Sequence, residues 1–314
     1  MTIPHDTFAG VYPAMTTPFT DGTDAVDHEQ LAADARRLAA AGVDGLVPVG
    51  STGEAATLTH DEHAEVVETV VDAVDVPVIA GTGSNSTREA LELSRRAADA
   101  GADALLLISP YYNRPEPAGQ YEHFATVADA VDLPQVVYNV PSRTGLNLDP
   151  DTVVELARHP NVQGYKAASG DPTRISGIVE RTRGETFDVL SGDDGMTLPL
   201  MSTGATGTVS VVANVEPERT GAMVGAALDG DFERARELHH ELGPLMRALF
   251  RETNPIPVKE AMAIRGYGPA EMRPPLTRGG DETLRVLTEL LAALEDGAET
   301  DPDGEGVESP PTGD

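Results

Sequence analysis

Short apolar runs alternate with longer amphipathic segments along almost the whole chain. Most of the short runs are continuously apolar, which is typical of parallel strands buried on both faces. They predict eight strands, at residues 10–17, 45–49, 76–81, 104–109, 135–139, 162–166, 187–191 and 207–211. The segments between them have the helical period, and helices are predicted at 29–41, 61–73, 87–100, 120–130 and 150–158. Capping residues start several of them, as at Thr59 followed by Asp61 and Glu62.

This alternation predicts an α/β fold of the (β/α)₈ TIM-barrel type, which takes about 250 residues. The barrel core would span 1–215, with its last helix running to about residue 229. Three more helical patterns, at 232–250, 256–264 and 282–294, predict an appended C-terminal helical segment over 230–294. Residues 295–314 are acidic, rich in proline and glycine and free of basic residues, and they predict a disordered tail. A doubly wound open sheet is the alternative, but no GxGxxG turn follows the first strand.

The charge balance excludes several classes of function. Against 52 acidic residues stand 22 basic ones, a formal net charge of −30, and only two of the basic residues are lysines. So acidic a surface repels nucleic acids and anionic membranes, and it suggests adaptation to high salt. The chain has no cysteine and hence no disulfide or thiolate chemistry. No apolar run is long enough to span a bilayer, and residues 1–6 lack the pattern of a signal peptide, so we expect a cytoplasmic protein.

Two candidate catalytic residues end neighbouring predicted strands. Lys166 ends the sixth strand and Tyr138 comes near the end of the fifth. In a barrel of this type, chemistry takes place at the carboxyl ends of the strands. A lysine in a dry barrel mouth has a lowered pKa and can attack carbonyls as a neutral amine, and a phenol beside it can move protons. The alternatives are a lysine paired with a carboxylate and a tyrosine of the core; the near absence of lysine elsewhere favours the catalytic interpretation.

Two further features suit a carboxylate ligand. The turn after the second strand contains Ser51 and Thr52 between glycines, so hydroxyls and main-chain N–H groups can bind an anion. It lacks the rest of a P-loop, which favours a small carboxylate over a triphosphate. Arg143 follows Tyr138 closely and could bind a carboxylate with two hydrogen bonds. A capped turn and a surface arginine are the simpler interpretations of the two features.

Together these motifs resemble a known family, the class I aldolases that include dihydrodipicolinate synthase and N-acetylneuraminate lyase. The resemblance covers residues 10–294 and rests on six segments: Gly-Ser-Thr-Gly-Glu at 50–54, Tyr-Tyr-Asn at 111–113, Tyr-Asn-Val-Pro at 138–141, Gly-Tyr-Lys at 164–166, Ser-Gly-Asp-Asp at 191–194 and residues 207–211. Arg143 and the Asn-Pro-Ile-Pro-Val-Lys segment at 254–259 favour the synthase subgroup.

The resemblance implies a TIM barrel and a lyase of diaminopimelate and lysine biosynthesis. Lys166 would form a Schiff base with pyruvate, and the resulting enamine would attack L-aspartate 4-semialdehyde to give 4-hydroxy-tetrahydrodipicolinate. Tyr138, Thr52 and Tyr112 would relay protons, with Tyr112 reaching across a subunit interface. The resemblance implies no cofactor and no metal, and a homotetramer built as a dimer of dimers.

Binding residues also follow from the resemblance. Ser51 and Thr52 would hold the pyruvate carboxylate and Arg143 the semialdehyde carboxylate, while Gly192 and Val209 would line the pocket. An allosteric site for L-lysine would be formed by Ala56, His60, His63, Asn85, Glu89 and Tyr111.

Two other functions stay open. A sister aldolase for 2-keto-3-deoxy sugar acids, or another pyruvate-dependent aldolase, would keep Lys166 and Tyr138 but would need hydroxyl partners where Arg143 stands. A barrel that only senses keto acids would have no need of an imine-forming lysine.

Overall fold

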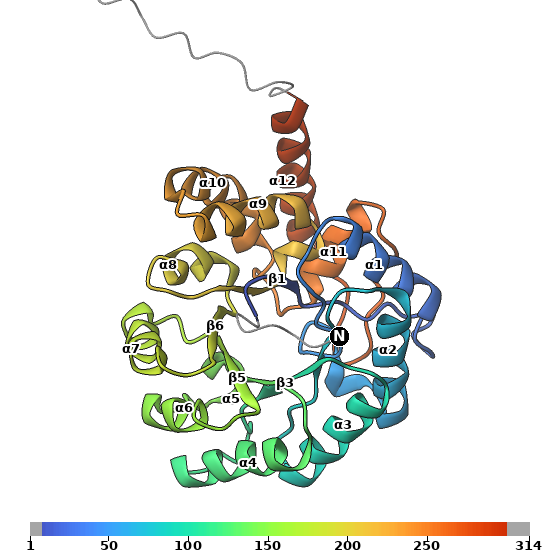
Figure 1. Ribbon diagram of the computed structural model, residues 1–314. Helices are drawn as coiled ribbons and strands as arrows, with labels where there is room; N and C mark the ends of the chain where they lie inside the picture. Colours follow the sequence, from blue (N-terminus) through green and yellow to red (C-terminus); the bar gives the residue numbers. More distant parts are fainter. Residues whose placement is uncertain (1–7, 300–314) are drawn as a thin grey trace, which may run out of the picture.

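Parallel strands form the centre of the protein, and helices surround them (Figure 1). The structure is a computed structural model that describes residues 8–299. Within that range seven strands form one sheet in the order β1-β7-β6-β5-β4-β3-β2. They are β1 (Gly10–Pro13), β2 (Ile79–Gly81), β3 (Ala104–Ile108), β4 (Gln135–Asn139), β5 (Val162–Ala167), β6 (Asp188–Ser191) and β7 (Gly207–Ser210).

The predicted strand at 45–49, the second along the chain, closes the ring without forming a ladder. Val47 makes a single parallel bridge to Ala14 beyond β1, and Leu46 makes one to Val78 before β2. Pro48 has no N–H to donate, and Val49 has a φ of 49°, so the extended run stops there. The segment fills the gap between the first and last strands of the sheet, and the predicted barrel fold is confirmed.

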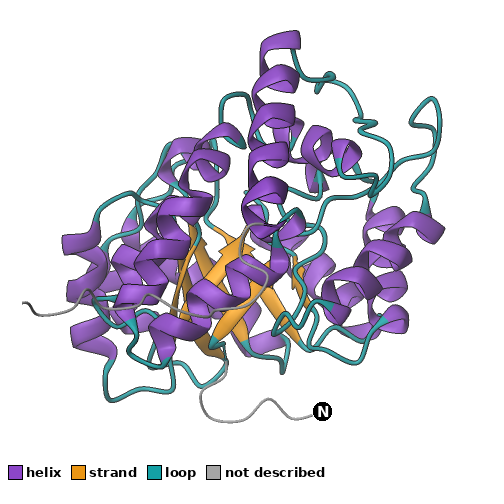
Figure 2. Ribbon diagram, turned by 90° about the horizontal axis from the view of Figure 1, so that it is seen from above, coloured by secondary structure: helices purple, strands orange, loops and turns teal. Residues whose placement is uncertain are grey.

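Helices fill the connections between the strands and cover the sheet (Figure 2). They are α1 (His28–Ala40), α2 (His60–Ala73), α3 (Thr87–Asp99), α4 (Pro117–Ala130), α5 (Pro141–Thr144), α6 (Pro150–Leu156), α7 (Pro172–Thr182), α8 (Thr197–Met201) and α9 (Pro217–Leu228), with short 3₁₀ turns η1 (Ala55–Thr57), η2 (Asp194–Met196) and η3 (Val212–Asn214). Helix α2 begins with a capping box: Thr59 accepts from the main-chain N–H of Glu62, whose carboxylate accepts from the N–H of Thr59.

The C-terminal helices pack against the barrel near β1 and α9. They are α10 (Phe232–Ala248), α11 (Ile256–Ile264) and α12 (Asp281–Glu299), and α10 packs extensively on α9. Helix α12 runs five residues into the segment 295–314 that composition assigns to a tail. Residues 295, 296, 298 and 299 are glutamate, aspartate or alanine, which the helical conformation tolerates. The rest of the predicted tail, 300–314, lies outside the described residues.

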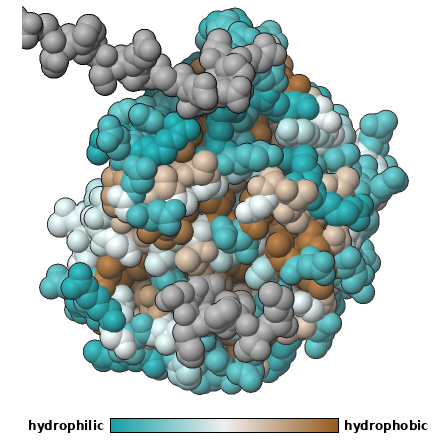
Figure 3. Space-filling view, turned by 45° about the horizontal axis from the view of Figure 1, so that its top comes forward, coloured by the Kyte–Doolittle hydropathy of each residue, from teal (hydrophilic) through white to brown (hydrophobic). Residues whose placement is uncertain are grey.

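The barrel interior is filled with apolar side chains, and hydrophilic residues cover the rim. Val47, Leu106, Val136, Leu190 and Val209 belong to one buried cluster inside the ring. On the face shown in Figure 3 the hydrophilic residues dominate the periphery and hydrophobic ones gather toward the middle. Among the described residues there is no helix with the length and apolarity that crossing a bilayer requires.

Candidate active site

Lys166 and Tyr138 are direct neighbours in the sheet. They are paired residues in the parallel ladder of β4 and β5. The Lys166 ammonium nitrogen lies 4.1 Å from the centre of the Tyr138 ring, and only 6% of Lys166 is exposed. The adjacency predicted for these strand ends is therefore present. It follows from register alone, because matched positions on adjacent parallel strands point their side chains the same way.

Burial changes the protonation of both residues. Loss of hydration lowers the pKa of Lys166 to about 7, an effect that the charge of Arg143 strengthens and that of Asp194 weakens. Burial raises the pKa of Tyr138 to about 12. Near neutral pH the amine can be free to act as a nucleophile, while the phenol keeps its proton.

Glycine at position 192 leaves room for the lysine. A Cβ placed there would lie 2.9 Å from both Cε and Cγ of Lys166, closer than carbon atoms approach. Behind this point the buried carboxylate of Asp194 accepts from the Ser210 hydroxyl (2.6 Å) and from the main-chain N–H groups of Val211 and Val212. Asp194 therefore fixes the loop after β7 and places a negative charge near the lysine.

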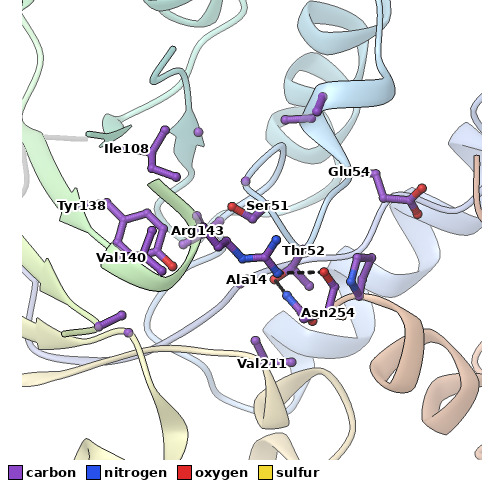
Figure 4. A pocket seen from close by; sticks show the side chains of 18 of the residues that line it. Ala14, Ser51, Thr52, Glu54, Ile108, Tyr138, Val140, Arg143, Val211 and Asn254 are labelled. Atoms are coloured by element: carbon purple, nitrogen blue, oxygen red, sulfur yellow. Dashed lines mark hydrogen bonds between the residues drawn. The ribbon is translucent and has the colours of Figure 1, made fainter. Parts of the chain in front are cut away.

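The predicted anion turn lies across the cavity from Tyr138, as Figure 4 shows for Ser51 and Thr52. Left-handed residues flank it: Val49 has a φ of 49° and Glu54 one of 53°. For a β-branched residue such as Val49 this conformation is strained, so tertiary contacts must hold the turn. One of them is the Thr17 hydroxyl, which donates to the Gly53 carbonyl at 2.7 Å.

Arg143 is held at the mouth of the same cavity. It lies on the short helix α5, directly after β4, and its Nη2 donates to the main-chain carbonyl of Asn254 at 2.8 Å. Asn139, at the end of β4, fixes the loop that follows: its Oδ1 accepts from the main-chain N–H of Leu148 (3.0 Å) and its amide donates to Asn147 (2.8 Å). Asn254 thus holds the guanidinium, and Asn139 holds the loop that follows α5.

These side chains share one cavity of about 1580 Å³. That exceeds the ~300–1,000 Å³ typical of a pocket for one small ligand, so several subsites fit in it. It brings together most of the predicted residues: Ser51, Thr52, Tyr138, Arg143, Lys166 and Gly192, with Ala56, His60, His63, Glu89 and Tyr111. Val209 instead packs inside the barrel, and Val211 lines the cavity in its place, because Val209 lies within β7 whereas Val211 follows the carboxyl end of that strand, where the cavity opens.

The residues proposed to bind L-lysine form a polar group in one part of the cavity. The His60 ring nitrogen Nε2 lies 3.1 Å from Glu89, whose carboxylate also accepts from the Ser84 hydroxyl. His63 is buried, and its Nε2 donates to the main-chain carbonyl of Gly81 at 2.8 Å. Burial lowers the pKa of His63, so its ring is neutral at physiological pH. Asn85 is not among the lining residues; its carbonyl accepts from Asn113 at 2.9 Å.

Tyr112 is not among the residues that line the cavity of Lys166. Its side chain is 88% exposed and its φ is +67°. It lines a shallow surface depression with Tyr111, Arg114 and Arg143. Among the described residues its hydroxyl makes no hydrogen bond to Tyr138 or Thr52.

Two buried residues contact the anion turn although they are not among the predicted site residues. Lys259 of α11 forms an ion pair with Glu54 and donates to the carbonyl of Glu271 at 2.7 Å. Asn254, which precedes α11, donates from its amide to the Thr52 hydroxyl at 2.9 Å. The rarity of lysine was a usable signal for Lys259; no pattern along the chain links Asn254 to a residue 202 positions earlier. Among residues 8–299 no cluster of histidine, aspartate or glutamate is suited to hold a metal ion.

Comparisons with known proteins agree on one family. The model of the dihydrodipicolinate synthetase family matches residues 7–294. A curated 4-hydroxy-tetrahydrodipicolinate synthase of Haloarcula marismortui is 71% identical over 290 residues, which cover 92% of this chain and 94% of the relative.

Solved structures give the same result. The chloride-inhibited dihydrodipicolinate synthase of Acinetobacter baumannii complexed with pyruvate is 40% identical, with a TM-score of 0.89 over 92% of this chain and 99% of that one. The enzyme of Cyanidioschyzon merolae with lysine bound is 38% identical, with a TM-score of 0.87 over 92% of this chain and 98% of that one.

Proposed function

The chain belongs to the dihydrodipicolinate synthetase family and is a lyase of diaminopimelate and lysine biosynthesis, and we propose that Lys166 carries its chemistry as a Schiff base with pyruvate. The observation that supports this most directly is the Lys166–Tyr138 pair: a buried amine of lowered pKa, 4.1 Å from the ring of a protonated phenol. A relative of 71% identity carries the synthase name. The sugar-acid aldolase has no comparable support.

The reaction begins when the neutral Lys166 amine adds to the carbonyl carbon of pyruvate. Water leaves, and the product is a protonated imine that withdraws electrons from the adjacent methyl group. Loss of one methyl proton gives an enamine. Tyr138 is suited to move protons here because its hydroxyl stays protonated and lies on the strand next to the lysine.

Carbon–carbon bond formation follows. The enamine carbon attacks the aldehyde of L-aspartate 4-semialdehyde, and the alkoxide that forms takes up a proton. The amine of the semialdehyde then attacks the imine carbon, the ring closes, and Lys166 leaves as a free amine. One water is released overall, and the product is 4-hydroxy-tetrahydrodipicolinate.

We assign the two carboxylates to opposite parts of the cavity. Ser51 and Thr52 bind the carboxylate of pyruvate, and Arg143 binds that of the semialdehyde. Arg143 suits this role because its guanidinium lines the cavity and is anchored by only one nitrogen to Asn254. Gly192 contributes by leaving space for Lys166.

We propose that Tyr112 completes the proton relay of a neighbouring subunit, together with Thr52 and Tyr138. Its 88% exposure, and its absence from the residues that line the cavity of its own chain, support this role. The assembly we propose is a homotetramer built as a dimer of dimers, acting in the cytoplasm.

A regulatory site for L-lysine is proposed at Ala56, His60, His63, Asn85, Glu89 and Tyr111. The Glu89 carboxylate, beside His60, can pair with the ligand's ammonium group, and a solved relative is described with lysine bound. Millimolar L-lysine should inhibit partially, and less in Glu89→Ala. Full activity of the wild type at saturating L-lysine would exclude regulation.

The proposed chemistry is tested by trapping and by rate. Incubation with pyruvate and borohydride should add a reduced pyruvyl group to the Lys166 peptide, with Lys259 as internal control because it is the only other lysine. Steady-state rates with L-aspartate 4-semialdehyde and with a sugar-acid aldehyde separate the two aldolases. An adduct on Lys259 or on neither lysine would overturn the mechanism, and a preference for the sugar aldehyde would overturn the substrate assignment.

A further inference from the structure

A buried asparagine joins two parts of the site that lie far apart in the sequence. Asn254 precedes α11, in the C-terminal helical segment, and is 6% exposed. It lines the cavity that contains Lys166 and Tyr138. Figure 4 shows it between Thr52 and Arg143, with its hydrogen bonds dashed.

The side chain and the main chain of Asn254 bind different partners. The Nδ2 atom donates to the Thr52 hydroxyl at 2.9 Å, and the main-chain carbonyl accepts from Arg143 at 2.8 Å. Arg143 and Thr52 are the residues to which we assign the two substrate carboxylates. The two contacts can be separated experimentally, since replacement of the side chain leaves the carbonyl in place.

The direction of the side-chain bond decides what Thr52 can do. A hydroxyl has one proton and two acceptor positions. Because the Thr52 oxygen accepts from Asn254, its own proton stays free to donate elsewhere. Thr52 is itself buried and lines the cavity, so the remaining direction for that proton is into the site.

The amide of Asn254 is only partly satisfied. Its Oδ1 is buried and has no hydrogen-bond partner among the described residues. An unpaired buried carbonyl is unfavourable for stability, so an asparagine here is better explained by the bond that its Nδ2 makes. The same segment contacts the turn a second time, since Lys259 forms its ion pair with Glu54, two residues after Thr52.

We infer that Asn254 is a positioning residue for the reaction, whose amide turns the Thr52 hydroxyl so that its proton is donated into the site. The inference rests on the proposed function, because it gives Thr52 a part in the proton relay. By this inference the C-terminal helical segment is part of the active site. The loops of the barrel alone do not complete that site.

A double-mutant cycle tests the inference. Asn254→Ala should lower kcat about tenfold, the loss expected of one hydrogen bond that orients a relay group. The KM for L-aspartate 4-semialdehyde and the trapping of saturating pyruvate on Lys166 should change less than twofold, whereas the KM for pyruvate should rise because Thr52 also binds its carboxylate. In a Thr52→Val background the same substitution should lower kcat no further. In a Thr52→Ser background, which keeps the hydroxyl, it should again lower kcat about tenfold.

Two further variants complete the design. Asn254→Asp keeps the shape but offers only acceptors, so it should draw the Thr52 proton away and lower kcat by a similar factor, and it serves in the cycle if the alanine variant does not fold. Asn161→Ala is the matched control: it too removes a side-chain amide, one that donates to the Ala128 carbonyl at 3.0 Å, ahead of the amino end of β5. Its kcat should stay within twofold of wild type.

The outcomes separate this inference from the proposed function. If the wild type traps pyruvate and condenses the semialdehyde, but the losses from Asn254 and Thr52 substitutions multiply, Asn254 acts through the fold and the inference is wrong. If the wild type does neither, the proposed function fails first.

Discussion

As the pH is lowered, the rate of Schiff-base formation should fall to half of its high-pH value near pH 7. Only the neutral amine of Lys166 attacks a carbonyl, and burial lowers the pKa of that amine from 10.5 to about 7. Above this pH the rate should be level, because the amine is already neutral. Below it the rate should fall tenfold for each pH unit.

The size of the effect follows from the two pKa values. At pH 7.5 a lysine of pKa about 7 is roughly three-quarters neutral, whereas one at 10.5 is neutral in about one molecule per thousand. The burial of Lys166 thus raises the supply of nucleophile on the order of 10³-fold. Its neighbours adjust this value in opposite directions, since Arg143 lowers the pKa and Asp194 raises it.

The assay is a single-turnover reaction with saturating pyruvate, stopped at set times with borohydride and followed by intact mass from pH 5 to 10. Circular dichroism at each pH checks that the protein stays folded. Asp194→Asn should move the midpoint to lower pH, because it removes the negative charge that favours the ammonium form. A rate that keeps rising tenfold per unit up to pH 10 would show that Lys166 is an ordinary solvated lysine and would refute the reasoning.

Four other outcomes are expected. Arg143→Ala should raise the KM for L-aspartate 4-semialdehyde by the equivalent of about 2 to 4 kcal/mol and spare pyruvate trapping; equal losses in both assays would make it a structural residue. Lys259→Met should destabilise the fold by about 3 to 5 kcal/mol in urea titrations, and Glu54→Gln added to it should recover most of the loss, because it removes the unpaired buried charge. Lys166→Met should raise the thermal midpoint most below pH 7, because there the folded wild type must bury a charged ammonium. The gain should shrink as the pH rises toward 10.5, where the lysine is neutral in both the folded and the unfolded state. A gain that does not depend on pH would contradict this. Thermal midpoints should also rise with salt, since the formal charge is −30, and a flat salt series would remove the proposed adaptation.

The parts of the site that the sequence predicts are those set by strand register. Lys166 and Tyr138 end consecutive parallel strands, so a barrel brings them side by side whatever surrounds it. The same reasoning places Gly192 next to Lys166, because β6 is the other neighbour of β5. These inferences need only the strand periodicity and the order of the elements.

Other features depend on how distant segments pack. Val209 and Val211 cannot be told apart by composition, and only the twist and the end of β7 decide which one faces the cavity. The 45–49 strand is shorter in the structure than its apolar run suggests, because Pro48 and the left-handed Val49 end its pairing. The bond from Asn254 to Thr52 exists only because α11 packs under the anion turn, and no local pattern specifies that packing.

The two lysines of this arginine-rich chain illustrate how composition can point to chemistry. Arginine stays protonated in proteins, so it cannot replace Lys166 in imine formation. Lys259 is 3% exposed, enclosed between the Glu54 carboxylate, the Glu271 carbonyl and the ring of Phe19, 4.5 Å from its nitrogen. A compact ammonium fits there, whereas a planar guanidinium with five N–H donors would leave several of them unpaired. A surface that selects against lysine therefore keeps it at two buried sites, one where the amine must lose its proton and one where it must hold the anion turn.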